Sequence, residues 1–437
     1  MAGMAVILFL ILRIKLHAFV ALLLGGLLIG VAAGMPLAKV LISVTDGMAN
    51  TLGVIAVLVG LGAMFGQMLE ASGGADALAR ALVARFGEKN APWSLALTGF
   101  LVAIPVFFDI GFIILVPIVY GLTVRTGNSI ISYGLPLLIG LATAHAFIPP
   151  TPGPIAVATL LQADIGWVIL FGAIAGFPAA VIAGPLFGRY VARKVIVGVP
   201  DYMRVERDAQ SSTPPPVFLV SSLIALPLVL IVGNTLSKVL LPESNSVRSI
   251  LMFIGHPMVA LLVSTLLCFT LLGTRRGVSA QEVRELASKA LEPAGLIILV
   301  TGAGGVLKQI LIDSGVGAVL GDMLAASSLP ALLLAFLTAA ILRLMQGSAT
   351  VAMLAAASLV ASIVGDAELS QPRLALMVVA IAAGASIASH VNDSGFWLVN
   401  RYLGLTVPQT LRTWTVATTL LSLIGLVMTM LIGLFVT

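Results

Sequence analysis

The chain has 437 residues, of which 59% are hydrophobic and 9% are charged, and its mean hydropathy is +1.15. Soluble domains carry about 25% charged residues, so this composition excludes an ordinary soluble domain. The net charge of +5 suggests Lys and Arg in cytoplasmic loops rather than nucleic-acid binding. The single cysteine, Cys268, lies in an apolar run, so no disulfide framework is expected.

Apolar runs follow one another along the whole chain and predict an all-α protein that crosses the membrane many times. The first run precedes Arg13 and Lys15, the reverse of a cleavable signal, and predicts a retained span. Several runs are short or interrupted by Gly and Pro, which favours half-helices and re-entrant hairpins. The predicted elements are 3–12, 16–34, 50–70, 92–108, 110–124, 130–148, 155–161 with 167–188, 217–236, 249–273, 294–311, 329–342, 347–364, 373–389 and 413–437.

One hydrophilic stretch, 189–216, divides the chain into a first membrane repeat, 1–188, and a second, 217–437. The stretch is basic and ends in Ser-Ser-Thr-Pro-Pro-Pro. Its Lys and Arg content predicts a cytoplasmic linker by the positive-inside rule.

The two halves share a motif. Counting from Gly60 and from Gly302, both read G-x-G-x4-Q-x-L-x2-S-G. Basic residues follow the first copy, whereas the second copy is preceded by them and followed by 316–330, which has no Lys or Arg. The copies are therefore expected to run in opposite directions, as in the inverted-topology repeats of secondary transporters.

A cluster of helix breakers interrupts an apolar region at Thr143–Pro154, which reads TAHAFIPPTPGP. Prolines cannot continue a helix, and non-helical backbone at membrane depth is tolerated where it lines a wet cavity. The stretch predicts a broken helix at a binding site, with His145, Thr151 and Gly153 as candidates. A Pro-rich turn outside the membrane is the structural alternative.

Two further stretches place charge inside apolar sequence. Asp109 lies in the frame FFDIGF, and a membrane carboxylate marks a functional site by default; a surface loop is the alternative. Arg343 precedes Gln-Gly-Ser-Ala-Thr, which resembles a hairpin tip whose hydroxyls and helix N-terminus face an anion. The guanidinium of Arg343 can donate two parallel hydrogen bonds to a carboxylate. The alternative is an interfacial Arg that snorkels to the membrane surface.

The fourth polar stretch, His390–Trp397, combines imidazole, amide, carboxylate and hydroxyl groups, or else forms a polar loop with an interfacial Trp. Together the four stretches suit an anionic, hydroxylated substrate. Asp109, His145, His390 and Asp393 are the candidate proton carriers, because buried carboxyls and imidazoles can titrate near neutral pH.

The sequence resembles the gluconate permease (GntP) family of bacterial inner-membrane transporters, almost throughout its length. The most specific segments are GAMFGQMLEASGGA, FFDIGFIILVPIV, HAFIPPTPGPIA, LKQILIDSGV, GSATVA and SHVNDSGFWL. The resemblance implies proton-coupled symport of gluconate or a related sugar acid across the bilayer, with the proton gradient as driving force and no cofactor. Other small carboxylates or hydroxy and amino acids, such as glycerate, lactate or D-serine, are the alternative substrates.

More distantly the chain resembles the ion transporter superfamily, whose members place two hairpins and two broken helices around the substrate. That resemblance implies a possible homodimer. It puts Asp109 and Gly111 at the first hairpin and Thr151 to Gly153 in the first broken helix. The second hairpin and second broken helix receive Gly347, Ser348, Thr350, Asn392, Asp393 and Ser394.

A membrane enzyme and a channel are the two other classes of function that the composition allows. A membrane enzyme finds no support, because the sequence has no zinc-type His-Glu-x-x-His, no Gly-x-Ser-x-Gly and no metal-ligand cluster. A channel is compatible with the inverted repeat, and dependence of uptake on the proton gradient distinguishes a symporter from it. No catalytic residue and no metal site are expected.

The opposed charge flanks of the two repeats can be tested by accessibility labelling. We expect single cysteines at Lys89 and Ser327 to be labelled from opposite sides of the membrane, with Lys89 cytoplasmic, because Lys and Arg are retained in the cytoplasm. Labelling of both positions from the same side would contradict the inverted repeat.

Overall fold

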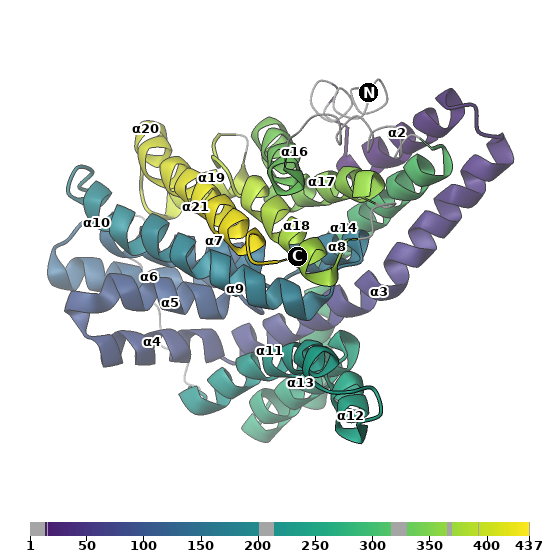
Figure 1. Cartoon of the computed structure of the whole chain (residues 1–437). Coiled ribbons are helices and arrows are strands. Elements are labelled where there is room, and N and C mark those ends of the chain that lie inside the picture. The colour runs from purple at the N-terminus through teal and green to yellow at the C-terminus, as the bar shows by residue number, and fades with distance from the viewer. Residues whose placement is uncertain are drawn as a thin grey trace.

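The computed structural model describes residues 14, 16–200, 214–315, 330–364, 369–391 and 393–436. Throughout these residues the ordered elements are helices (Figure 1). Seven of the described helices are long and apolar enough to cross a membrane. The predicted first span, 3–12, and the labelling position Ser327 lie outside the described residues.

The first half contains a hairpin and a broken helix. Helices α5 and α6 form the hairpin, whose turn spans 103–107, and the break between α7 and α8 spans 148–151. The bounds are α2 Ala18–Ala32, α3 Leu37–Ala71, α4 Gly74–Phe86, a 3₁₀ turn Glu88–Asn90, α5 Ala91–Val102, α6 Phe108–Thr126, α7 Ile131–Phe147, α8 Pro152–Leu161 and α9 Ile165–Val181, continued by a π-helical turn Ile182–Leu186 and α10 Phe187–Ala192.

The second half repeats this order. Its hairpin, α16 and α17, turns at Gly347 and Ser348, and the break between α18 and α19 spans 386–393. The bounds are α11 Val217–Leu240, α12 Ser246–Ile254, α13 Pro257–Cys268, a π-helical turn Phe269–Gly273, a 3₁₀ turn Thr274–Arg276, α14 Ala280–Asp313, α16 Ala331–Gln346, α17 Ala349–Val364, α18 Gln371–Ala385, α19 Ser394–Tyr402, α20 Val407–Thr410, a π-helical turn Leu411–Thr415 and α21 Val416–Gly433.

The two halves correspond in register. The offset that separates Gly60 from Gly302 also carries the turn of the first hairpin onto that of the second, and the first break onto the second. The predicted fold class, an all-α membrane protein of two inverted repeats with hairpins and broken helices, is thereby confirmed. The interpretation of Thr143–Pro154 as a broken helix also holds, because residues 148–154 are all buried inside the protein.

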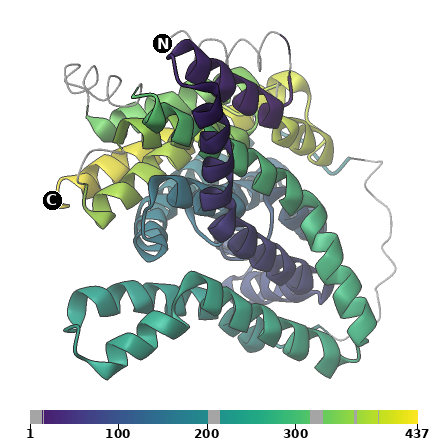
Figure 2. The same ribbon diagram turned by 90° about the vertical axis from the view of Figure 1, so that its right-hand side faces the viewer.

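Helices α3 and α14 carry the repeated motif and lie antiparallel, side by side (Figures 1 and 2). At one end Ser43 donates a hydrogen bond to Asp313 at 2.6 Å, and farther along Gly47 faces Gly305. A methyl group on Gly47 would lie 2.7 Å from the Gly305 carbonyl oxygen. The glycines therefore allow the two helix backbones to touch.

Several helix ends differ from the predicted spans. The run 50–70 is the second part of α3, and 294–311 is the second part of α14, because the first turns of both helices are too polar to read as a span. The run 249–273 divides into α12 and α13 at Gly255 and His256. The helix expected to end at 188 continues to Ala192, and 201–213 of the predicted linker lie outside the described residues.

A polar contact fixes the turn that follows the first broken helix. Asp164 caps α9 by accepting hydrogen bonds from the backbone of Gly166 and Trp167, and it also accepts from Thr235 and Lys238 of α11. Burial raises the pKa of this carboxyl, but these hydrogen bonds and the Lys238 charge outweigh burial and hold its pKa below the ordinary value.

The close contact of α3 with α14 can be tested with Gly47→Ala. We expect a loss of stability of about 1–3 kcal/mol, because the methyl group overlaps the Gly305 backbone, which cannot move without separating the helices. Thermal unfolding of the detergent-purified protein measures it. Gly53→Ala is the matched control on α3, where a methyl meets nothing within 4 Å. Equal stability of the two variants would contradict this packing.

Candidate functional site

A cavity of about 220 Å³ lies where the two hairpins and the second break meet α7 and the last helix. Its polar lining comes from five places in the sequence. Two apolar side chains, Phe108 and Trp414, stack at 5.7 Å between ring centroids and form part of its wall. The described lining residues are Phe107, Phe108, Asp109, Ala142, His145, Ala146, Arg343, Ser348, Ala349, Thr350, Met353, Ser386, Asp393, Ser394, Gly395, Trp414, Thr418 and Leu421.

Three helices begin at this cavity: α6 at Phe108, α17 at Ala349 and α19 at Ser394. The first N–H groups of a helix have no partner within the helix, and its N-terminus carries partial positive charge. An anionic group of a bound molecule is therefore favoured here. Hydroxyl groups of Ser348, Thr350 and Thr418 stand beside these helix ends.

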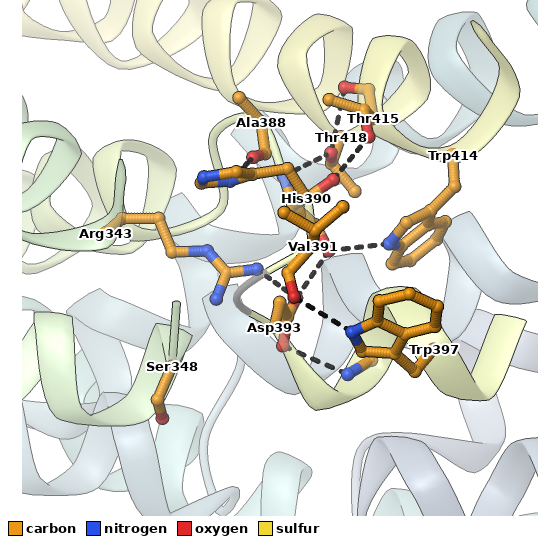
Figure 3. A network of polar contacts seen from close by, with 12 residues as sticks. Arg343, Ser348, Ala388, His390, Val391, Asp393, Trp397, Trp414, Thr415 and Thr418 are labelled. Carbon is orange, nitrogen blue, oxygen red and sulfur yellow. Dashed lines mark hydrogen bonds and ion pairs between the residues drawn. The ribbon is translucent and has the colours of Figure 1, made fainter. Parts of the chain in front are cut away.

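Arg343, near the C-terminus of α16, is the most buried charged side chain of the described cavity lining. It is 4% exposed. Its Nη2 donates to Asp393, forming an ion pair that joins the second hairpin to the second break (Figure 3). Removing one member of a buried pair typically costs about 3–5 kcal/mol, because the other charge is left alone. The interpretation of Arg343 as a snorkelling interfacial residue is therefore wrong.

Two nitrogens of Arg343, Nε and Nη1, have no hydrogen-bond partner among the described residues, although they are buried. A guanidinium has five N–H donors, all of which seek acceptors. Buried donors without acceptors are costly, and the described residues leave this side chain incompletely satisfied. An acceptor-rich molecule in the cavity, above all a carboxylate, can complete its bonding.

Asp393 is held rigidly. One oxygen caps α19 by accepting from the Gly395 backbone at 3.0 Å, and the other accepts from Arg343 and from the Ser389 hydroxyl. Trp414 donates to that hydroxyl at 2.7 Å, as Figure 3 shows. The last helix also satisfies the open backbone of the break, since Thr418 accepts from the Ser389 N–H at 3.1 Å.

Known proteins resemble this chain over almost its whole length. The model of the GntP family permeases matches residues 1–435. A low-affinity gluconate transporter of Escherichia coli (strain K12) is 39% identical over 97% of this chain and 95% of its own. The inner membrane permease YgbN of the same strain is 41% identical over 98% and 96%.

The chain belongs to the GntP permease family.

A solved structure supports the fold alone. The YdaH transporter of Alcanivorax borkumensis, whose topology is described as unusual, superposes with a TM-score of 0.64 over 90% of this chain and 88% of its own, at 17% identity. With the family and the seven described helices that are long and apolar enough to cross a membrane, the predicted multi-pass inner-membrane location is confirmed, as is a role in transport rather than catalysis.

The structure brings together seven of the residues singled out as substrate contacts or proton carriers from the sequence of this GntP permease. All seven line the cavity, and their roles stay predictions: Asp109, His145, Arg343, Ser348, Thr350, Asp393 and Ser394. Asp109 is exposed and makes no hydrogen bond to the described residues, whereas the buried Nδ1 of His145 has no partner among them. Asn392 lies outside the described residues.

The other predicted residues stand behind the cavity wall. Thr151 donates to the Ile148 carbonyl at 2.7 Å, and Gly153 gives room to Met353, a lining residue. Gly111 packs against Leu141, and Gly347 takes the left-handed conformation, φ +90°, that turns the second hairpin. The His390 ring lies 3.0 Å from the Ala388 carbonyl and does not line the cavity. None of these five residues belongs to the cavity lining, and their predicted roles stay predictions.

Three residues of the last helical region were not singled out from the sequence. Trp414, Thr418 and Leu421 line the cavity from the π-helical turn and α21. Their spacing, close to one helical turn each, places them on one face. Within a long apolar run this pattern resembles ordinary core packing. Of the three residues, only the polar Thr418 has a side chain that could have indicated a binding site.

Proposed function

We propose that this permease imports gluconate or a related sugar acid across the inner membrane, together with protons. The observation that carries the proposal is the guanidinium of Arg343, two of whose nitrogens have no partner among the described residues, in a cavity that also holds hydroxyl groups and three helix N-termini. A polyhydroxy monocarboxylate offers one group to the cation and several to the hydroxyls. The two family members described above are named a gluconate transporter and an inner membrane permease.

The charges of the cavity support proton coupling. Among its described lining residues Arg343 is the one cation, while Asp109 and Asp393 are carboxylates. A substrate anion adds a third negative charge to a low-dielectric site, where like charges are costly. Asp393 already has an ion pair, and Asp109 has none with the described residues. A proton on Asp109 would offset the charge of the substrate, with no cofactor beyond the proton gradient.

Uptake into proteoliposomes tests the substrate class directly. A panel of gluconate, other aldonates, glycerate, lactate and D-serine distinguishes the sugar acid from the alternative small carboxylates and amino acids. Accumulation that requires an inward proton gradient supports symport, and equilibration without one supports a channel. The dimer implied by the superfamily resemblance stays a prediction.

Arg343→Lys is expected to weaken the apparent affinity for the acid about tenfold or more, although the charge is kept. Lys presents one nitrogen, which cannot serve Asp393 and a substrate carboxylate from separate sites as a guanidinium does. Competition against labelled gluconate measures it, with Lys238→Arg, outside the cavity, as the control. An unchanged affinity in the Lys variant would return Arg343 to a structural role.

Asp109→Asn is expected to abolish uphill accumulation, because the amide cannot take up or release the proton. Exchange of labelled for unlabelled acid across the membrane should survive, since Arg343 and the hydroxyls remain. The control, Asp76→Asn, removes a carboxylate that pairs with Arg80 outside the cavity. If the Asp109 variant still concentrates the acid with normal pH dependence, coupling resides at another group, with His390 and Asp393 next to be tested.

A further inference from the structure

We infer that Asp393 restricts the cavity to singly charged acids by neutralising Arg343 before any substrate arrives. The inference rests on the proposed function and goes beyond it, because it assigns a specificity-determining role to one residue. Its starting point is that Arg343 meets a carboxylate of the protein and still has two nitrogens without a partner among the described residues.

The Asp393 carboxylate is fixed in place from several directions. Its contacts come from α16 through Arg343, from the start of α19 through Gly395, and from the break through Ser389, which Trp414 holds in turn. A carboxylate bound in this way stays beside Arg343 when a substrate occupies the remaining nitrogens. The guanidinium then serves two anions, one of which belongs to the protein.

This arrangement sets a limit on the charge of the substrate. With Asp109 protonated, the pair of Arg343 and Asp393 leaves the described lining of the cavity with no net positive charge. One substrate carboxylate gains hydrogen bonds from Nε or Nη1 and from helix N-termini. A second carboxylate on the same molecule finds no further cation among the described lining residues and is repelled by Asp393 and by the first carboxylate of the substrate itself.

Pairs of acids that differ by one carboxylate test the inference on the wild-type protein. In proteoliposomes, gluconate should compete with labelled substrate at least about tenfold better than glucarate, the six-carbon acid with a carboxylate at both ends. The monomethyl ester of glucarate, which is larger than glucarate but singly charged, should compete like gluconate. If the ester competes no better than the free diacid, size rather than charge excludes it and the inference fails.

Asp393→Asn is the matching variant. It should improve competition by glucarate at least about tenfold more than competition by gluconate, because Arg343 is then free to offset a second charge. Asp76→Asn, the control outside the cavity, should leave the ratio unchanged. A ratio that does not move in a folded Asp393→Asn protein would overturn the assignment.

The variant leaves a buried cation alone, so its stability supplies a second readout. Bound gluconate should raise the melting temperature of Asp393→Asn more than that of wild type, because the ligand then supplies the missing anion. An equal or smaller rise would count against the inference. If wild type takes up glycerate and not gluconate, the proposed substrate fails, while glycerate against tartronate, its diacid counterpart, still tests the role of Asp393.

Discussion

A backbone N–H or C=O group inside a bilayer must find a hydrogen-bond partner, and this constraint shapes the whole protein. Helices satisfy it along their length, but each break and hairpin turn leaves open groups at membrane depth. The protein meets this by burying the breaks within itself. Side chains of the last helical region bond the backbone of the second break at Ser389, and the Thr151 hydroxyl bonds the Ile148 carbonyl in the first.

The same constraint explains why the site stands where it does. Helix ends with unpaired N–H groups would be costly in the hydrocarbon of the bilayer. Three of them lie instead around one cavity, where their N–H groups can bind an anion. Arg343, near the C-terminus of α16, pairs with Asp393, which caps the N-terminus of α19. The ion pair therefore serves the architecture by joining hairpin to break, and it sets the charge that a substrate meets.

The long helices α3 and α14 give this arrangement a frame. Their antiparallel contact depends on Gly47 of α3, which precedes the first copy of the motif, and on Gly305 within the second copy, while the first hairpin packs against Gly66 within the first copy. A methyl group on Gly66 would lie 2.0 Å from the Pro105 carbonyl oxygen in that hairpin turn. Glycines of these two long helices thus fix both the pairing of the two repeats and the position of a cavity element.

Much of this protein follows from the sequence by itself. Apolar run length, breaker clusters and a motif repeated in register determine membrane-crossing helices, the breaks and the inverted halves, because these depend on local chemistry and on the membrane as solvent. Asp109, Arg343 and Asp393 stood out because a charged side chain within an apolar run is costly to place in a membrane and therefore indicates a functional role. The sequence could not show that Asp393 takes one nitrogen of Arg343, since fifty residues separate them and only packing sets that distance. Nor could it distinguish Trp414 from a core aromatic residue or place Gly111, Thr151 and Gly153 behind the wall. Those outcomes depend on how helices distant in the chain pack together, and tertiary structure alone decides them.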